Sequence, residues 1–185
     1  KTNLSLFGNK AAAKYGLKEG DYESLHRWSI EQPEQFREEV WTDATVIYSR
    51  TYERVMGPPM MPGTQWFEGS QLNFAENLLE RGKDEDKAIR FTGETGKNSI
   101  LTRKELKTAV ARCAAGLKDA GVKKGDRVAA VVANCPEAVI GALASASLGA
   151  VWSSCSPDFG ISGIHDRLGQ IEPKILITVN AYYYN

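Results

Sequence analysis

Residues 127–134 read RVAAVVAN, and this short apolar stretch decides the class of fold. Apolar residues fill consecutive positions instead of alternate ones, which is typical of a strand covered on both faces. A second candidate strand, GAVWSS, covers 149–154, and a third, KILITVN, covers 174–180. Helical patterns lie between them, at 134–147 and 160–173. The order strand, helix, strand, helix, strand predicts a doubly wound, largely parallel sheet with flanking helices, in the α/β class.

A further helix is predicted before this region. Residues 87–101 read as a strand, a glycine-rich turn and a second strand. Thr102 and Glu105 then form a capping box, the pattern that begins a helix. An apolar stripe follows at steps of three and four residues: Leu106, Val110, Cys113 and Leu117. We therefore interpret Cys113 as a small core residue and not as a nucleophile.

Residues 1–83 have a less regular apolar pattern than the rest of the chain. This pattern predicts a mostly helical, partly irregular N-terminal extension. Between residues 22 and 40, large apolar side chains recur at helical spacing: Tyr22, Leu25, Trp28, Phe36 and Val40. The GPPMMPG run at 57–63 indicates a loop, and residues 66–80 include a short helix with Leu78 and Leu79. We expect two domains, the extension at 1–83 and the first part of an α/β domain at 84–185.

Composition excludes several classes of function. Lys plus Arg and Asp plus Glu both number 23, so the net charge is zero and predicts neither nucleic-acid nor membrane partners. Three cysteines without a CxxC pair and two separated histidines argue against a disulfide framework or a metal site. The first residues show no signal peptide, and we expect a cytoplasmic protein.

Common catalytic motifs are missing from the sequence. GxGxxG, GxSxG and HExxH do not occur. The run GETGKN at 93–98 superficially resembles a phosphate loop, but Phe91 stands where the first glycine belongs and Asn98 replaces Ser or Thr. A hairpin turn explains this run better. No residue of the chain is therefore predicted to be catalytic.

The stretch AVWSSCSPDFG at 150–160 is the unusual feature of the chain. Small hydroxyl and thiol residues fill 153–156, where an apolar strand ends. In parallel sheets, ligands bind outside the carboxyl ends of the strands. Two interpretations stay open: an ordinary turn in which Asp158 caps the next helix, or a surface along which a ligand passes closely.

Several stretches resemble the AMP-forming acyl-CoA synthetase (adenylating) superfamily. YESLHRWSIEQPEQF at 22–36 and WFEGSQLNFAENLL at 66–79 are similar to its short-chain branch, of which the N-terminal extension is typical. WSSCSPDFG at 152–160 is similar to the acetoacetate-activating enzymes. Acetyl- and propionyl-activating relatives usually carry two glycines at the positions of Ser153 and Ser154, and Glu at that of Asp158.

The resemblance implies the amino-terminal part of an acetoacetate–CoA ligase of ketone-body and lipid metabolism. ATP with magnesium would activate acetoacetate as an acyl-adenylate, and the thiol of coenzyme A would then form the thioester. The matching positions Trp152, Ser153 and Ser154 would lie along the passage for the pantetheine arm of coenzyme A. The phosphate loop, the adenine-binding segment and the catalytic lysine would follow Asn185, so we expect this chain alone to be inactive.

Two other functions fit the same residues. The parent could be a ligase for another short acyl acid, because the acyl pocket would lie mostly outside this chain. A non-catalytic binding or structural module that keeps the first half of the fold is the alternative from a different class. The oligomeric state does not follow from the sequence.

Overall fold

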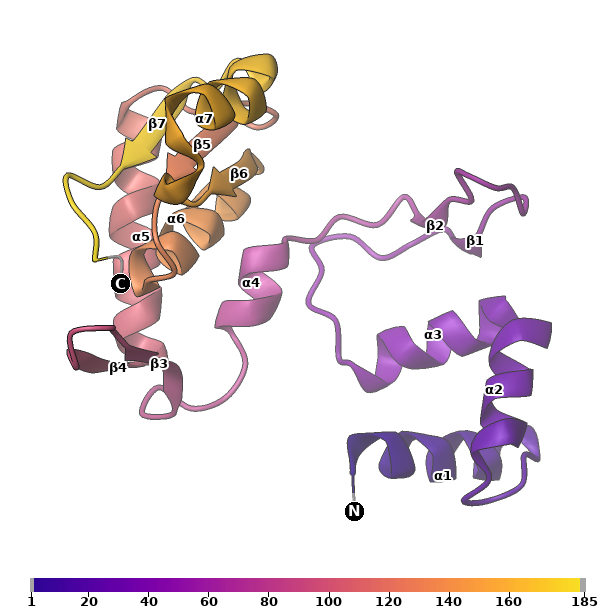
Figure 1. Ribbon diagram of the computed structural model, residues 1–185. Helices are drawn as coiled ribbons and strands as arrows, with labels where there is room; N and C mark the ends of the chain where they lie inside the picture. Colours follow the sequence, from indigo (N-terminus) through magenta and orange to yellow (C-terminus); the bar gives the residue numbers. More distant parts are fainter. Residues whose placement is uncertain (1, 184–185) are drawn as a thin grey trace. The chain divides into compact units, whose positions relative to one another are not determined.

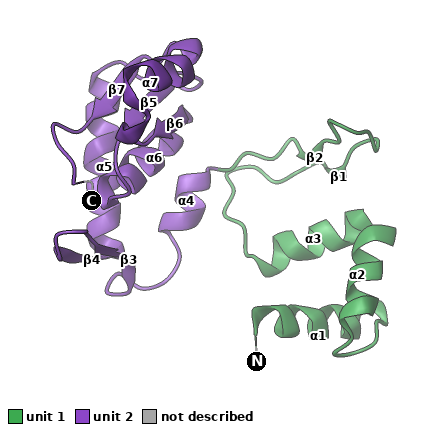
Figure 2. Cartoon of the chain, viewed as in Figure 1, with its two compact units in different colours: residues 1–72 green, residues 73–185 purple. Residues whose placement is uncertain are grey.

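The computed structural model describes residues 2–183, which form two compact units that divide between Leu72 and Asn73 (Figure 2). Each unit has its own helices and its own β-structure. The expected domain boundary after residue 83 stays a prediction, since a compact unit is not by itself a domain.

The first unit contains three helices and a small hairpin (Figure 1). Its elements are α1 (Asn3–Tyr15), α2 (Tyr22–Glu31), α3 (Pro33–Asp43), β1 (Arg54–Met56) and β2 (Trp66–Glu68). The strands β1 and β2 are antiparallel, and the GPPMMPG segment connects them as a loop. Helix α1 and this hairpin are additions to the sequence-based expectation.

Aromatic packing and one buried carboxylate hold the helices of this unit together. Trp28 is 6% exposed, and its ring lies 4.6 Å from that of Tyr15 and 5.6 Å from that of Phe36. The buried carboxylate of Glu39 accepts hydrogen bonds from Lys14 Nζ at 2.5 Å and Tyr15 Oη at 3.0 Å. The bond to Glu39 raises the pKa of Lys14, which stays charged. These contacts join α1, α2 and α3.

Two of the apolar positions predicted on helix faces of this unit are exposed, Val40 at 36% and Tyr22 more strongly. Tyr22 has the helical spacing that would place it beside Trp28, yet 61% of its surface is exposed. Tyr22 is the first residue of α2, and its ring stacks on that of His26 one turn later. The apolar face of α2 therefore begins after its first residue.

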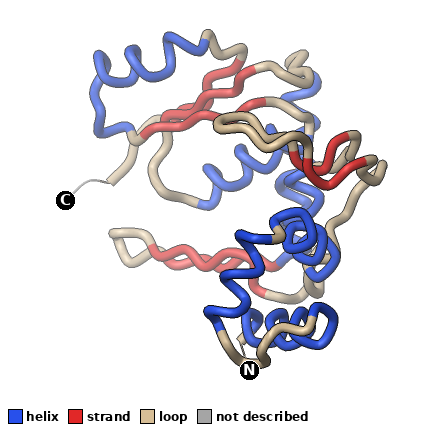
Figure 3. The backbone as a smooth tube through the Cα atoms, turned by 90° about the vertical axis from the view of Figure 1, so that its right-hand side faces the viewer, coloured by secondary structure: helices blue, strands red, loops and turns tan. Residues whose placement is uncertain are grey.

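The second unit contains a hairpin, four α-helices and a parallel sheet. Its elements are α4 (Phe74–Leu79), β3 (Lys87–Thr92), β4 (Asn98–Thr102), α5 (Arg103–Asp119), β5 (Arg127–Val131), α6 (Pro136–Ser147), β6 (Val151–Cys155), α7 (Gly160–Leu168) and β7 (Ile175–Thr178). The β3–β4 hairpin forms a twisted two-stranded ribbon (Figure 3). Short 3₁₀ turns flank α7 at Pro157–Phe159 and Gly169–Ile171.

The sheet has the predicted doubly wound α/β arrangement. Its strand order is β6–β5–β7, and both neighbours run parallel to β5. β5 ends at Val131 and not at Asn134 as predicted, because Cys135 and Pro136 begin α6. The chain passes from β5 through α6 to β6 and then through α7 to β7, on the far side of β5, and helices cover both faces of the sheet.

The side chains of β5 alternate between two hydrophobic layers. Val128 belongs to the larger layer, which α5 and α6 cover, whereas Ala129 and Val131 pack with Leu168 of α7. The predicted stripe of α5 lies in the larger layer, with Leu106, Val110 and Leu117 buried. Cys113 packs against the same layer, and burial raises the pKa of its thiol. The capping box of Thr102 and Glu105 is also present.

Asn73 joins two helix ends through one side-chain amide. Its Oδ1 accepts hydrogen bonds from the backbone N–H groups of Ala75 at 2.9 Å and Glu76 at 3.3 Å, at the start of α4. Its Nδ2 donates to the carbonyl of Ala146 at 2.9 Å, near the end of α6. Helix ends leave such N–H and carbonyl groups without partners inside the helix. Asn73 therefore caps α4 and attaches it to α6.

An Asn73→Asp substitution separates these two contributions. Asp keeps the acceptor for α4 but places a carboxylate oxygen against the Ala146 carbonyl. We expect the free energy of unfolding, measured by urea denaturation, to fall by about 1–3 kcal/mol. Asn98→Asp on the exposed hairpin is the matched control and should change it by less than about 0.5 kcal/mol. If Asn73→Asp is as stable as the unsubstituted protein, the contact with α6 contributes nothing.

Candidate functional site

The three parallel strands end at the same level, which defines a carboxyl edge of the sheet. Val131 of β5 lies in register with Cys155 of β6 and Thr178 of β7, and these are the last residues of their strands. The N–H of Val132 still donates to the Cys155 carbonyl at 3.2 Å, so the ladder continues one residue further. Ligands of open parallel sheets bind at this edge.

The opposite, amino edge of the sheet is closed by charged side chains. Lys174 Nζ donates to Asp126 Oδ2 at 3.0 Å and to the Gly121 carbonyl at 2.5 Å. Arg127 Nε donates to the Ile171 carbonyl at 2.8 Å. The hydrogen bond from Lys174 lowers the pKa of Asp126, so this carboxylate is ionised at neutral pH. These contacts are structural and leave the carboxyl edge as the candidate site.

A cavity of about 430 Å³ opens at the carboxyl edge. The lining has three parts. The β3–β4 hairpin contributes residues 91–95 and 97, the segment between β5 and α6 contributes 133–135, and the segment after β7 contributes 179 and 181–183. Glu94 and Lys97 are its charged residues, and Phe91, Tyr182 and Tyr183 supply aromatic rings. This lining suits a small, partly aromatic molecule, but it holds no paired acid and base.

Cys135 is the residue of this cavity that could in principle act as a nucleophile. It is the residue before α6, with an extended backbone, and its thiol is partly buried. Burial raises the pKa of this thiol, so the unreactive protonated form prevails at neutral pH. The prediction that the chain carries no catalytic residue stays a prediction, and this thiol gives no reason to change it.

The GETGKN run is a hairpin turn, as predicted. The N–H of Gly93 donates to the Lys97 carbonyl at 2.8 Å, and Gly96 has φ of 78°, which favours glycine. Its residues form one wall of the cavity. They pair with each other across the turn and do not open a helix, as a phosphate loop would.

The predicted pantetheine residues lie inside β6 and not after it. Side chains of a strand alternate between its faces, so Trp152 and Ser154 share the face of Val128 and Ala130. Ser153, in register with Ala129, is on the α7 face. Ser154 is exposed, whereas Trp152 and Ser153 are partly buried. All three residues lie outside the lining of the cavity.

Trp152 has a structural role in the larger hydrophobic layer. Its indole packs on α6 at Gly141, where a methyl group would lie 2.7 Å from Cη2 and 2.9 Å from Cζ3. Small residues let this helix lie close to the sheet, and Ala144 and Ser145 are fully buried. At Gly141, α6 lies so close to Trp152 of β6 that an added methyl group has no room.

The loop after β6 forms an ordinary turn. Ser156 Oγ donates to the Asp158 carboxylate at 2.7 Å and accepts from the Asp158 N–H at 3.3 Å. The interpretation that Asp158 caps the next helix is wrong, because a 3₁₀ turn intervenes and α7 begins at Gly160 without a side-chain cap. The Arg167 guanidinium instead lies 3.9 Å from the centre of the Phe159 ring.

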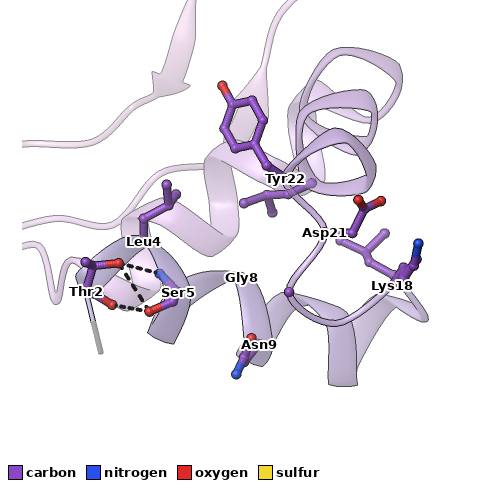
Figure 4. Close-up of a pocket in the computed structure, with 11 residues that line it drawn as sticks. Thr2, Leu4, Ser5, Gly8, Asn9, Lys18, Asp21 and Tyr22 are labelled. Carbon is purple, nitrogen blue, oxygen red and sulfur yellow. Dashed lines mark hydrogen bonds between the residues drawn. The ribbon is translucent and has the colours of Figure 1, made fainter.

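A second cavity, of about 150 Å³, lies in the first unit between α1 and α2 (Figure 4). Its lining is mainly apolar and includes Leu4 and Leu25. At its rim, Thr2 and Ser5 bond to each other, with Ser5 Oγ donating to the Thr2 carbonyl at 2.9 Å. These groups bond to one another at the start of α1, and the Asp21 carboxylate accepts from the Ser24 N–H at 3.1 Å at the start of α2. Thr2 and Asp21 therefore act as helix caps at this cavity.

Within residues 2–183, no three His, Cys, Asp or Glu side chains gather closely enough to hold a metal ion. Over the same range, no helix combines the length and the apolar character needed to cross a bilayer.

Comparison with known families identifies relatives for both parts of the chain. A family model described as AMP-binding enzyme matches residues 77–184, and one described as acetyl-coenzyme A synthetase N-terminus matches residues 22–78. The acetoacetyl-CoA synthetase of Xenopus tropicalis is 40% identical over 100% of this chain and 28% of its own length. The malonamoyl-CoA synthetase of Penicillium aethiopicum is 41% identical over 100% of this chain and 26% of its own.

A solved structure agrees with these sequence matches. The acetoacetyl-CoA synthetase from Streptomyces lividans superposes with a TM-score of 0.93 at 41% identity, over 97% of this chain and 28% of that one. The chain thus spans little more than a quarter of the length of the relatives it matches.

The contact between Trp152 and Gly141 is tested by Gly141→Ala. The new methyl group would collide with the indole, so we expect a loss of about 1–3 kcal/mol in the free energy of unfolding. Gly116→Ala in α5 is the matched control, because nothing lies within 4 Å of its added methyl group. That variant should gain up to about 1 kcal/mol from helix propensity. Equal stability of the two variants would contradict the packing described for Trp152.

Proposed function

The chain belongs to the AMP-binding enzyme family, and we propose that it is the amino-terminal portion of an acetoacetate–CoA ligase. The observation that carries this proposal is identity of about 40% with acetoacetyl-CoA synthetases over the whole chain. The similar backbone of the Streptomyces enzyme supports it. The cytoplasmic location and the role in ketone-body and lipid metabolism remain predictions.

The proposed reaction has two steps that share one acyl group. The carboxylate of acetoacetate attacks the α-phosphorus of ATP, and pyrophosphate leaves with magnesium as its counter-ion. The thiolate of coenzyme A then attacks the acyl carbon, and AMP leaves. Both steps develop charge on phosphate or on the acyl oxygen, which requires fixed positive groups or N–H donors. Those groups would come from the part of the enzyme that this chain does not include, so this chain alone should not adenylate an acid.

The contribution of this chain to coenzyme A binding would come from β6. Within residues 2–183, β6 is an outer strand of the sheet, so a thin ligand that crosses it could contact Ser153 on one face and Ser154 on the other. The exposed Ser154 hydroxyl could bond to a pantetheine amide, and the small Ser153 would leave room beside it. Trp152, held against α6, would form the fixed wall of this passage.

This proposal is tested in the intact enzyme by Ser153→Leu and Ser154→Leu, made separately. Each added side chain should narrow the passage, so we expect thioester formation to slow by about ten-fold or more while adenylate formation changes little. Rapid-quench assays of the two half-reactions measure this ratio. Thr108→Leu on the exposed surface of α5 is the control and should affect neither. Equal losses in both half-reactions would exclude a passage for coenzyme A at β6.

One other acid is a specific candidate for the substrate. An acetoacetyl and a malonamoyl group have the same heavy-atom skeleton and differ in a methyl or an amino group on the distal carbonyl. The similarity to a malonamoyl-CoA synthetase therefore favours malonamate as the second candidate substrate. A pocket that recognises only the shape of the acyl group would discriminate weakly between acetoacetate and malonamate. A polar residue that hydrogen-bonds the amino group of malonamate would discriminate strongly between them.

A substrate panel decides between these functions. We expect ATP-dependent pyrophosphate release by the intact protein to show its highest kcat/KM with acetoacetate, ahead of malonamate, acetate and propionate. Intact mass should first establish that the protein has the length of its relatives. A preference for malonamate would replace the substrate, and a preference for acetate or propionate would favour another short-chain acyl-CoA synthetase. If no acid releases pyrophosphate from protein of full length, the non-catalytic module becomes the better description.

A further inference from the structure

We propose that Met61, in the loop between β1 and β2, is the preferred site of oxidation by hydroperoxides. The three methionines of the chain lie within six residues, at 56, 60 and 61, but their environments differ strongly. Met61 is 97% exposed and Met60 is 60% exposed. Met56 lies inside β1 and is partly buried. This inference is independent of the proposed function.

The loop is fixed in a way that presents Met61 and restrains Met60. The Gly57 N–H donates to the Gln65 carbonyl at 2.9 Å and closes the loop at its base. Thr64 Oγ1 accepts from the Met60 N–H at 2.9 Å and donates to the Met60 carbonyl at 2.8 Å. The Met60 sulfur lies against Gly63, 3.4 Å from the position of a methyl group there. Met61 extends from this closed loop into solvent.

Met56 is protected by the pairing of the hairpin. It lies in register with Trp66 of β2, and its side chain is partly covered. The cover of its side chain reduces the access of an oxidant to its sulfur. The gradient of exposure therefore predicts a gradient of reactivity within one hairpin.

Oxidation of methionine by a hydroperoxide needs no group of the protein other than the thioether. The sulfur lone pair attacks the terminal oxygen of the hydroperoxide, a sulfur–oxygen bond forms and the oxygen–oxygen bond breaks. The leaving alkoxide or hydroxide takes up a proton and departs as alcohol or water. Sulfur loses two electrons and the peroxide gains them. The product sulfoxide is polar, which is tolerated in solvent at Met61 but disturbs packing at a partly buried position such as Met56.

Peptide-resolved mass spectrometry of the intact protein in dilute hydrogen peroxide tests the proposal. We expect Met61 to gain one oxygen atom fastest, Met60 about three-fold more slowly and Met56 about ten-fold more slowly, in order of exposure. Near-UV circular dichroism should not change when only Met61 has reacted. In urea-unfolded protein the three rates should become equal. Met61→Leu should remove the fastest phase, and Met56→Leu, the matched control, should leave it intact.

Three outcomes would overturn the proposal. The first is reaction of Met56 or Met60 as fast as Met61, and the second is persistence of the same order of rates in unfolded protein. The third is an unreactive Met61 in the intact protein together with normal reactivity after unfolding, which would mean that another segment covers the loop. Loss of the near-UV signal with oxidation of Met61 alone would overturn the conclusion that this position tolerates the sulfoxide.

Discussion

Burial of β5 on both faces is the constraint on which the second unit depends. Val128, Ala129 and Ala130 are fully buried, and β6 and β7 pair with the two edges of the strand. A strand in this position keeps every backbone group bonded and has no room for a polar side chain. Polar chemistry can therefore occur only where the strand ends. At the amino edge of the sheet, the strand end is closed by the pair of Asp126 and Lys174. At the carboxyl edge, the strand end opens at the cavity beside Asn134.

The parts of the fold that the sequence predicted are those with local signals. The uninterrupted apolar run of β5 and the capping box at Thr102 depend on neighbouring residues, and both are present. Helix α1 and the β1–β2 hairpin were missed for a different reason. Each strand of that hairpin has three residues, and contacts between residues far apart in the sequence fix it, such as that of Trp41 with Phe67 at 4.5 Å. Such short strands have no readable period.

The candidate site was predictable only in part. The rule for parallel sheets indicated the carboxyl edge, and a cavity opens there, but its lining combines hairpin residues within 91–97 with residues within 179–183, which no motif links. That this edge binds a ligand stays a prediction. Strand alternation within the predicted strand at 149–154 already separates Ser153 from Trp152 and Ser154, and β6 (Val151–Cys155) has this alternation. The dependence of Trp152 on Gly141 is a tertiary contact without a local signal.

The amide of Asn73 has a consequence for how the protein responds to acidity. A primary amide donates and accepts without gaining or losing a proton in the range where proteins fold. Stability depends on pH only through groups whose proton affinity differs between the folded and unfolded chain. The attachment of α4 to α6 therefore adds nothing to that dependence, in contrast to the Asp126–Lys174 pair at the amino edge. In acid, protonation of Asp126 weakens its ion pair with Lys174, whereas the hydrogen bonds of the Asn73 amide keep their full strength.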